Sequence, residues 1–187
     1  DSLQSINIPE TVEYIGRYAF YGCKTLSEVH IPETVEYIGR YAFHLTNNLN
    51  VYFKASILPL YLQENWDYGI NGYYVGVQET YTDGDFELAK LYNGTIGIIK
   101  YNGSDSIVDL TKLNVGIITQ IGGYSFESTS IEKIILPNTL KAIDRNAFAN
   151  SSIKEISIPS SVEQIGDHAF NNSCISALVG ILQFPPQ

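Results

Sequence analysis

The chain has 187 residues, of which 44% are hydrophobic, and it carries a formal net charge of −9 at pH 7. The apolar fraction excludes a disordered chain, and the length allows a substantial buried core. The negative charge disfavours nucleic acid and anionic lipid as partners, because basic surfaces bind both. No run of about 18 apolar residues occurs, so we expect no membrane span in this sequence.

One motif, IPETVEYIGRYAF, stands at 8–20 and recurs unchanged at 31–43. Looser copies stand at 136–148 and 158–170. An apolar residue precedes each copy, with a spacing of 23 residues early in the chain (Leu3, Leu26, Leu49) and 22 later (Ile131, Ile153, Ile175). A fixed period in the twenties is typical of a solenoid of leucine-rich-type coils, in which each coil must stack on its neighbours.

Each repeat reads as a short strand followed by a return segment. Ile6 and Ile8 alternate with polar residues, which predicts a strand with one buried face, and Pro9 ends it because it lacks an N–H. Gly16 permits either a positive φ or a close backbone approach. Asp144 replaces this glycine in one repeat, and we expect the turn to survive because Asp tolerates the left-handed region.

The pattern resembles the BspA-like subclass of leucine-rich repeats. The resemblance rests on L-x-x-I-x-I-P-x-x-V-x-x-I-G-x-x-A-F in four fairly complete copies, which with a degenerate unit near Ile121 cover well over half the chain. It implies a β-rich solenoid and a surface or secreted protein, mostly of bacteria, associated with adherence to host matrix proteins and other cells. No signal peptide is visible, and we expect the sequence to be a fragment, because it starts inside a repeat without Met.

Residues 1–68 are predicted to form a first leucine-rich repeat array of 23-residue coils with a terminal cap. Its two near-identical repeats should stack identical side chains, Tyr14 on Tyr37 and Tyr18 on Tyr41 among them. Arg17 and Arg40 are expected to offset the like charges of Glu13 and Glu36.

The end of this array is marked by a third strand at 49–53 without a following Ile-Gly or Ala-Phe. Members of the family often end an array with a strand and a short helix bearing Tyr and Trp, and 60–66 (LYLQENW) resembles that segment. The resemblance implies that Trp66 is a capping plug rather than a ligand platform.

Residues 69–106 are predicted to form an antiparallel β-meander that caps the second array. The expected strands are 73–81, 86–92 and 95–101, separated by Asp-Gly and Asn-Gly, which are strong hairpin signals. Residues 107–187 then form the second array of 22-residue coils, with an irregular first unit at 108–126 and a last strand at 175–181.

Cys23 and Cys174 fall in repeats near opposite ends of the chain. Strands of adjacent coils lie about 4.8 Å apart, so several coils exceed the ~6 Å between the Cα atoms of a disulfide. We therefore predict no intrachain disulfide between them.

No catalytic or metal-binding constellation stands out. The three histidines read as solvated side chains. Asp83, Asp85 and Glu87 lack the ligand spacing of a calcium loop and straddle an expected turn. We expect no enzyme activity, no metal and no cofactor.

The candidate binding surface consists of side chains repeated on the exposed faces of the coils. Tyrosine gives large contact area at low entropy cost, although tyrosine ladders can also simply shield the coil edges. The candidate partner-binding residues are Tyr14, Tyr18, Tyr37 and Tyr41 on the return segments, and Glu28, His30, Lys133 and Glu155 on the strand faces.

The repeat and the exposed tyrosines favour a non-enzymatic protein-binding module. The family resemblance implies that it is of adhesion type, located at the cell surface or secreted, with a host matrix or cell-surface protein as partner. Two alternatives stay open. One is a structural spacer, and the other is an accessory domain of a larger secreted protein or enzyme. Glycan binding is a weaker variant, because Tyr and Trp also stack on sugars.

Overall fold

The computed structural model describes residues 3–46, 49–55 and 61–179, apart from the side chains of Asn71 and of residues 177–179. The chain divides into two compact units, residues 1–79 with 91–93 and residues 80–90 with 94–187. Each unit is a stack of coils and has its own hydrophobic core. The division into segments 1–68, 69–106 and 107–187 stays a prediction.

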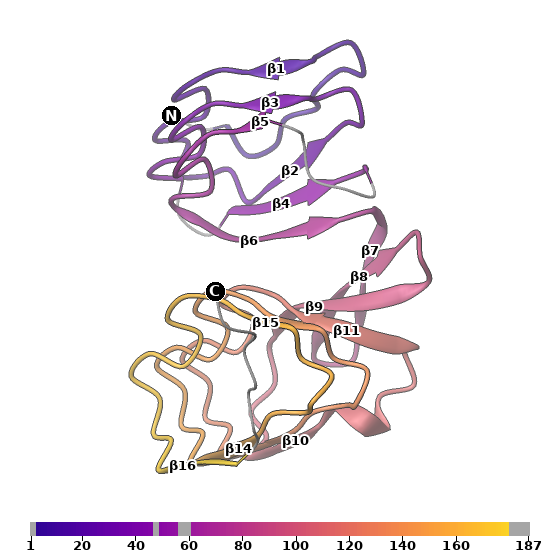
Figure 1. Cartoon of the computed structure of the whole chain (residues 1–187), viewed down its shortest axis with the longest axis vertical. Helices are drawn as coiled ribbons and strands as arrows, with labels where there is room; N and C mark the ends of the chain where they lie inside the picture. The colour runs from indigo at the N-terminus through magenta and orange to yellow at the C-terminus, as the bar shows by residue number, and fades with distance from the viewer. Residues whose placement is uncertain (1–2, 47–48, 56–60, 180–187) are drawn as a thin grey trace. The chain divides into compact units, whose positions relative to one another are not determined.

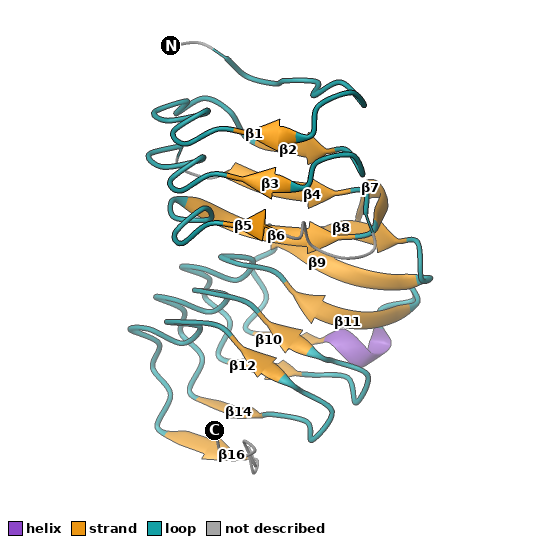
Figure 2. Cartoon of the chain, turned by 45° about the horizontal axis from the view of Figure 1, so that its top comes forward, coloured by secondary structure: helices purple, strands orange, loops and turns teal. Residues whose placement is uncertain are grey.

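The coils consist mostly of turns joined by short strands (Figure 2). The strands of the first part are β1 (Tyr14–Ile15), β2 (Glu28–Ile31), β3 (Tyr37–Ile38), β4 (Leu49–Phe53), β5 (Tyr61–Leu62), β6 (Ile70–Val75) and β7 (Val77–Asp83). The strands that follow are β8 (Phe86–Leu91), β9 (Thr95–Tyr101), β10 (Ile107–Asp109), β11 (Ile117–Ile121), β12 (Lys133–Ile135), β13 (Ala142–Ile143), β14 (Glu155–Ser157), β15 (Gln164–Ile165) and β16 (Ala177–Val179).

Unit 1 contains two parallel sheets, β1-β3-β5 and β2-β4-β6, one on each side of its coils (Figure 1). Tyr14 pairs with Tyr37 and Tyr37 with Tyr61, so equivalent residues of successive coils lie side by side. Pro32 directly follows β2, as a residue without an N–H should. The predicted β-solenoid is confirmed.

A close backbone approach, and not a positive φ, explains the recurring glycine of the motif at Gly39 and Gly166. A β-carbon built on Gly39 would lie 2.5 Å from the Arg17 backbone nitrogen and 2.7 Å from the Gly16 carbonyl carbon. Neither Gly16, Gly39 nor Asp144 has a positive φ, so the left-handed reading of this position was wrong. The left-handed residue comes two positions later, for example Tyr18 at φ 59°.

Aromatic side chains fill the core of unit 1. The rings of Phe20 and Phe43 stack with centroids 5.3 Å apart, and Phe43 is fully buried. Trp66 is buried and packs edge-on against Phe43 and Phe53, in agreement with its predicted role as a plug. Each coil thus contributes a large apolar side chain to one continuous core.

The helix expected at 60–66 is wrong for the described residues 61–66, and Leu60 lies outside them. Tyr61 and Leu62 form β5, which continues the sheet of β1 and β3. Asn65 then takes the left-handed conformation (φ 57°) that Tyr18 and Tyr41 hold in the earlier coils. The first array therefore completes a third coil where the sequence pattern had faded.

The predicted meander is confirmed in β7, β8 and β9, which are neighbours in one sheet, and is wrong only at the start of its first strand, where 73–75 belong to β6. β6 runs parallel to β4 and belongs to the solenoid, and Gly76 at φ 70° separates it from β7. β8 and β9 form the expected antiparallel pair, and β9 begins and ends where the sequence predicted. The turn at Gly84 (φ 54°) confirms that Asp83 and Asp85 flank a hairpin.

Unit 2 contains a sheet in the order β10-β12-β14-β16 and a sheet in which β15, β13, β11 and β9 run parallel. Its first coil is irregular, as predicted: β11 has a register shift between Ile118 and Gln120 against β9. A short 3-10 helix, η1 (Leu110–Lys112), follows β10 and is capped by the Asp109 carboxylate, which accepts from the Thr111 N–H. A hydrogen bond from the Thr111 hydroxyl, together with the one from its N–H, lowers the pKa of Asp109.

The core of unit 2 repeats the aromatic stacking of unit 1. Phe126 stacks on Phe148 with centroids 5.1 Å apart, and Phe148 on Phe170 at 5.3 Å. Asp144 occupies the glycine position of the middle coil, where its Oδ2 accepts from Gln120 Nε2 at 2.7 Å. Its partial burial raises the pKa of the Asp144 carboxyl to about 6.

Both cysteines are unbridged: Cys23 is half-buried and Cys174 is exposed. Within the described parts of the chain, no helix has the length and apolar character that crossing a membrane requires.

Candidate functional site

The first tyrosine ladder lies on the sheet of β1, β3 and β5. The rings of Tyr14 and Tyr37 stack almost parallel, at 6°, with centroids 4.2 Å apart. Tyr61 follows in register on β5, and Tyr14 and Tyr61 are 60% and 56% exposed. A hydrogen bond with Tyr14 raises the pKa of the Tyr37 hydroxyl. The coils thus present a flat phenolic surface to solvent.

The second ladder lies in the turns that follow β1 and β3. Tyr18 and Tyr41 both have left-handed backbones, at φ 59° and 57°, and their rings stack 5.7 Å apart at 13°. Left-handed conformation costs a residue with a β-carbon about 1 kcal/mol. Both predicted Tyr-on-Tyr stacks are confirmed, and both are partly open to solvent.

Three further rings surround the second ladder. Tyr21 meets Tyr18 edge-on at 5.6 Å and His44 at 5.5 Å, while Tyr68 meets Tyr41 at 6.2 Å and His44 at 5.0 Å. Tyr18, Tyr21, Tyr41, His44 and Tyr68 are called the turn cluster below. Tyr18, Tyr21 and His44 line a shallow hollow in its surface.

Sequence reasoning missed Tyr21, His44 and Tyr68, because these residues follow the motif and differ in type. A signal was available: the three stand about one repeat apart, so a solenoid must bring them together.

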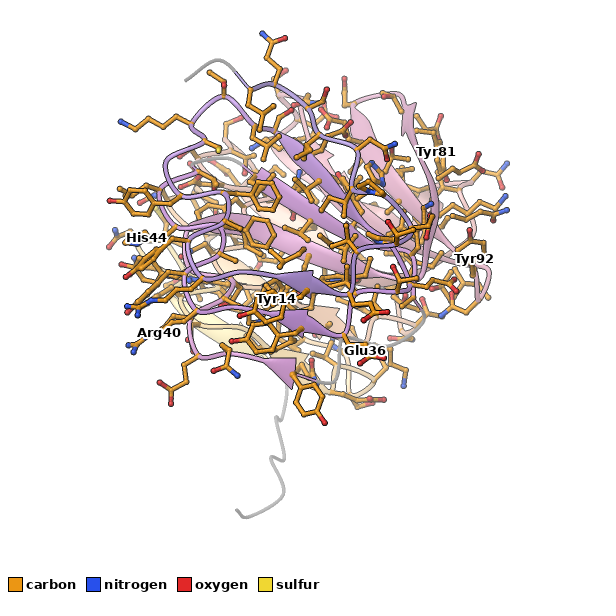
Figure 3. The ribbon with its side chains drawn as sticks, turned by 90° about the horizontal axis from the view of Figure 1, so that it is seen from above. Tyr14, Glu36, Arg40, His44, Tyr81 and Tyr92 are labelled. Carbon is orange, nitrogen blue, oxygen red and sulfur yellow. The ribbon has the colours of Figure 1, made fainter. Side chains whose placement is uncertain are left out.

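Arg17 and Arg40 lie against the turn cluster. Each guanidinium carbon stands 4.8 Å from the centroid of the next residue's ring, Tyr18 and Tyr41, which is a cation–π distance. Each also donates to that tyrosine's hydroxyl, at 3.2 and 3.3 Å. Among the described residues neither arginine forms an ion pair with Glu13 or Glu36, and the expected offset of those two charges stays a prediction. Figure 3 shows Arg40 and His44 projecting on the side of the turns.

The strand-face candidates of unit 1 are Glu28 and His30, both exposed on β2. The His30 ring stacks on Tyr52 at 5.0 Å, and Tyr52 stacks on Tyr74 at 5.5 Å. Tyr52 and Tyr74 are buried, so only His30 of this column reaches solvent.

The candidates of unit 2 are Lys133 and Glu155, which pair in register on β12 and β14. Both line a groove of about 370 Å³ whose floor and walls include Ile135, Leu136 and Pro159. Ile135 is 39% exposed, so this groove combines apolar lining residues with two neighbouring side chains of opposite charge.

The candidate residues therefore form separate groups. The four tyrosines, Glu28 and His30 belong to unit 1, and Lys133 and Glu155 belong to unit 2. Within the described residues, no group of His, Cys, Asp or Glu has the arrangement of a metal site. What these surfaces offer chemically is aromatic contact, phenolic hydrogen bonding and two guanidinium groups that form no ion pair with a described residue.

Comparison with known families gives one clear match. The family described as "BspA type Leucine rich repeat region" matches residues 1–61 and 93–180 in six copies. No curated protein sequence matches this chain.

Several solved structures resemble the chain at low sequence identity. A leucine-rich repeat protein from Bacteroides capillosus is 22% identical, with 56% of this chain and 99% of that protein covered and a TM-score of 0.39. A leucine rich cell surface protein from Faecalibacterium prausnitzii is 15% identical, with 88% and 62% covered and a TM-score of 0.42. The pneumococcal vaccine antigen PcpA is 20% identical, with 95% and 62% covered and a TM-score of 0.39. This chain thus spans under two thirds of the length of the last two proteins.

Proposed function

Since this chain belongs to the BspA-type leucine-rich repeat family, we propose that it is a non-enzymatic, surface-displayed or secreted module that binds a partner protein through the tyrosine ladders of its first array. The partner class is a host matrix or cell-surface protein. Binding uses Tyr14 with Tyr37 and Tyr18 with Tyr41.

The observation that carries the proposal is the parallel stacking of exposed tyrosines across neighbouring coils. Four rings are fixed by their neighbours at 4.2 and 5.7 Å, so they lose little side-chain entropy when a partner covers them. Tyrosine of this kind is enriched in protein interfaces. An exposed polar column of mixed residues would offer neither rigidity nor contact area.

The chain itself suggests substitutions that remove the rings and keep the coil. Asn65 and Asn146 hold the left-handed position of Tyr18 and Tyr41, and Gln164 holds the position of Tyr14 and Tyr37. The double variants Tyr18→Asn/Tyr41→Asn and Tyr14→Gln/Tyr37→Gln therefore use residues that the fold already accepts.

The test is a pull-down and titration of the intact chain against extracellular matrix proteins and purified host-cell surface proteins. We expect a saturable partner whose affinity falls about tenfold or more in at least one ladder variant. Tyr92→Gln, at a tyrosine 58% exposed outside the ladders, should bind as the parent chain does. Equal binding by all variants would remove the ladders from the mechanism.

Absence of any partner, where a known adhesin control binds, would favour the structural spacer. One observation supports that second candidate: coil-to-coil hydrogen bonds run in register from β1 through β3 to β5, which makes a regular stack.

A further inference from the structure

Two arginines face the turn cluster without carboxylate partners in a chain whose net charge is −9. Both are exposed, and among the described residues no ion pair involves either. Ion pairs of exposed lysines occur elsewhere on the described surface, at Lys54, Lys112, Lys141 and Lys154. The turn side of unit 1 therefore presents two guanidinium groups whose charges no carboxylate of the described residues neutralises within ion-pair distance.

The two guanidinium groups are held in a repeated geometry. Each lies 4.8 Å from a tyrosine centroid and is hydrogen-bonded to that tyrosine's hydroxyl. The backbones below them nearly touch, as the 2.5 Å from a Gly39 β-carbon to the Arg17 nitrogen shows. Neighbouring coils are spaced by about 4.8 Å, so two preorganised donors project one coil apart. In the third coil Glu64 takes this position, so the basic column is two coils long.

We infer that the turn cluster with Arg17 and Arg40 recognises an acidic peptide segment of the partner protein. This inference rests on the proposed function and names the chemistry of the partner. Guanidinium groups form strong charge-assisted hydrogen bonds with carboxylates, and arginine clusters are a recurrent means of reading acidic motifs. The hollow between Tyr18, Tyr21 and His44 receives the apolar part of the segment next to its carboxylates.

An anionic glycan fits the same surface less well. Sugars bind aromatic residues by lying on a free ring face. Arg17 and the stacked ring of Tyr41 lie over Tyr18, and Arg40 and Tyr18 lie over Tyr41. These contacts reduce the ring face left for a sugar, and the phenol hydroxyl groups and guanidinium groups suit peptide carbonyls, amides and carboxylates.

The experiment measures binding of the intact chain to a short dye-labelled peptide of alternating Glu and Gly, with the Gln-Gly peptide and a sulfated polysaccharide as comparison probes. We expect the Glu-Gly peptide to bind and the Gln-Gly peptide not to bind. Raising the salt from about 50 to about 500 mM should weaken binding, because it screens the guanidinium–carboxylate contacts.

Arg17→Gln/Arg40→Gln should reduce affinity for the Glu-Gly peptide about tenfold. The matched control is Lys112→Gln/Lys141→Gln in unit 2, which removes the same number of positive charges from exposed ion pairs. It should leave the affinity within about twofold, because those lysines lie outside the turn cluster. Circular dichroism of both double variants checks that the coils are intact.

Three results would overturn the inference: no binding of the Glu-Gly peptide, equal losses in the arginine and lysine variants, or an arginine-dependent binding confined to the sulfated polysaccharide. The tyrosine variants test the proposed function separately from this inference. A protein partner that is lost in the tyrosine variants but held fully by Arg17→Gln/Arg40→Gln would leave the ladders in place and remove the acidic segment.

Discussion

Gly39 lies directly against the backbone of Arg17 in the preceding coil: a β-carbon at Gly39 would stand 2.5 Å from the Arg17 nitrogen and 2.9 Å from its α-carbon. Gly39 N–H also donates to the Ile15 carbonyl at 2.8 Å. Glycine fits here because the Arg17 backbone leaves no space for a side chain at Gly39, and not because of its own backbone angles. Gly16, its equivalent in the preceding coil, would place a β-carbon 3.6 Å from a Tyr14 ring atom, which is an ordinary contact.

This difference predicts unequal effects of one substitution at two identical motif positions. Gly39→Ala should lower the free energy of unfolding by about 2–3 kcal/mol, because the added methyl meets backbone atoms that cannot move without parting the coils. Gly16→Ala should change it by less than about 1 kcal/mol. Urea denaturation of both variants measures the two values, and equal losses would contradict the close-approach explanation.

Ser125 occupies the alanine position of the motif. The four fairly complete repeats carry alanine there, and the fully buried Ser125 hydroxyl has no hydrogen-bond partner among the described residues. Ser125→Ala should therefore stabilise the protein by about 1 kcal/mol, since it removes a desolvated polar group. Ser151→Ala is the matched control and should destabilise by a similar amount, because the buried Ser151 hydroxyl donates to the Phe148 carbonyl at 2.8 Å. A thermal melt of each variant gives the two signs.

Asp144 should make stability depend on pH. Partial burial raises its pKa from the ordinary 3.8 to about 6, so the fold prefers the protonated acid. The stabilisation is complete below the unfolded-state pKa and is lost as the pH rises through 6. Asp144→Asn keeps an acceptor for Gln120 and should be more stable than the parent chain by about 2 kcal/mol at pH 8, a value that includes a discount for partial exposure. That difference should vanish below pH 4, and a pH-independent difference would refute the assignment.

The left-handed turns predict which residues can replace tyrosine. Tyr18→Asn and Tyr41→Asn lose ring contacts but relieve backbone strain, so each should change the free energy of unfolding by less than about 1 kcal/mol. Tyr41→Val should cost more than about 2 kcal/mol, because a β-branched residue is strongly disfavoured at a φ of 57°. Chemical denaturation of the three variants tests the ranking, and a tolerated valine would show that this turn can change conformation.

The regular coils could be predicted from sequence because identical residues recur at a fixed period. That period alone places Tyr14 on Tyr37, and the structure confirms the contact. The third coil could not be predicted in this way. In it Trp66 stands where Ala42 stands one coil earlier, and Gln63 stands in the place of Gly39, so the motif is lost while the backbone path is kept. Only pairing with β3 defines β5, and pairing is a spatial property.

The binding surface, too, could be predicted from the sequence only in part. The ladders follow from repetition, but the orientation of Arg17 toward Tyr18 instead of Glu13 depends on the left-handed turn between them. A φ of 59° at a tyrosine is not suggested by any sequence preference, so the turn cluster and its guanidinium groups emerge only from the folded chain. Lys133 and Glu155 were placed correctly on one strand face, and their role in binding stays a prediction.

The coil-by-coil hydrogen bonding has a mechanical consequence. Each 22- or 23-residue coil is tied to the next by strands of only a few residues, so tension applied along the chain can peel one coil without loading all the others. Releasing such a coil adds about 80 Å of contour length. A surface protein built from this unit would lengthen in small, evenly spaced steps under shear flow. The total extension that such a protein can reach under load would be set by its number of coils.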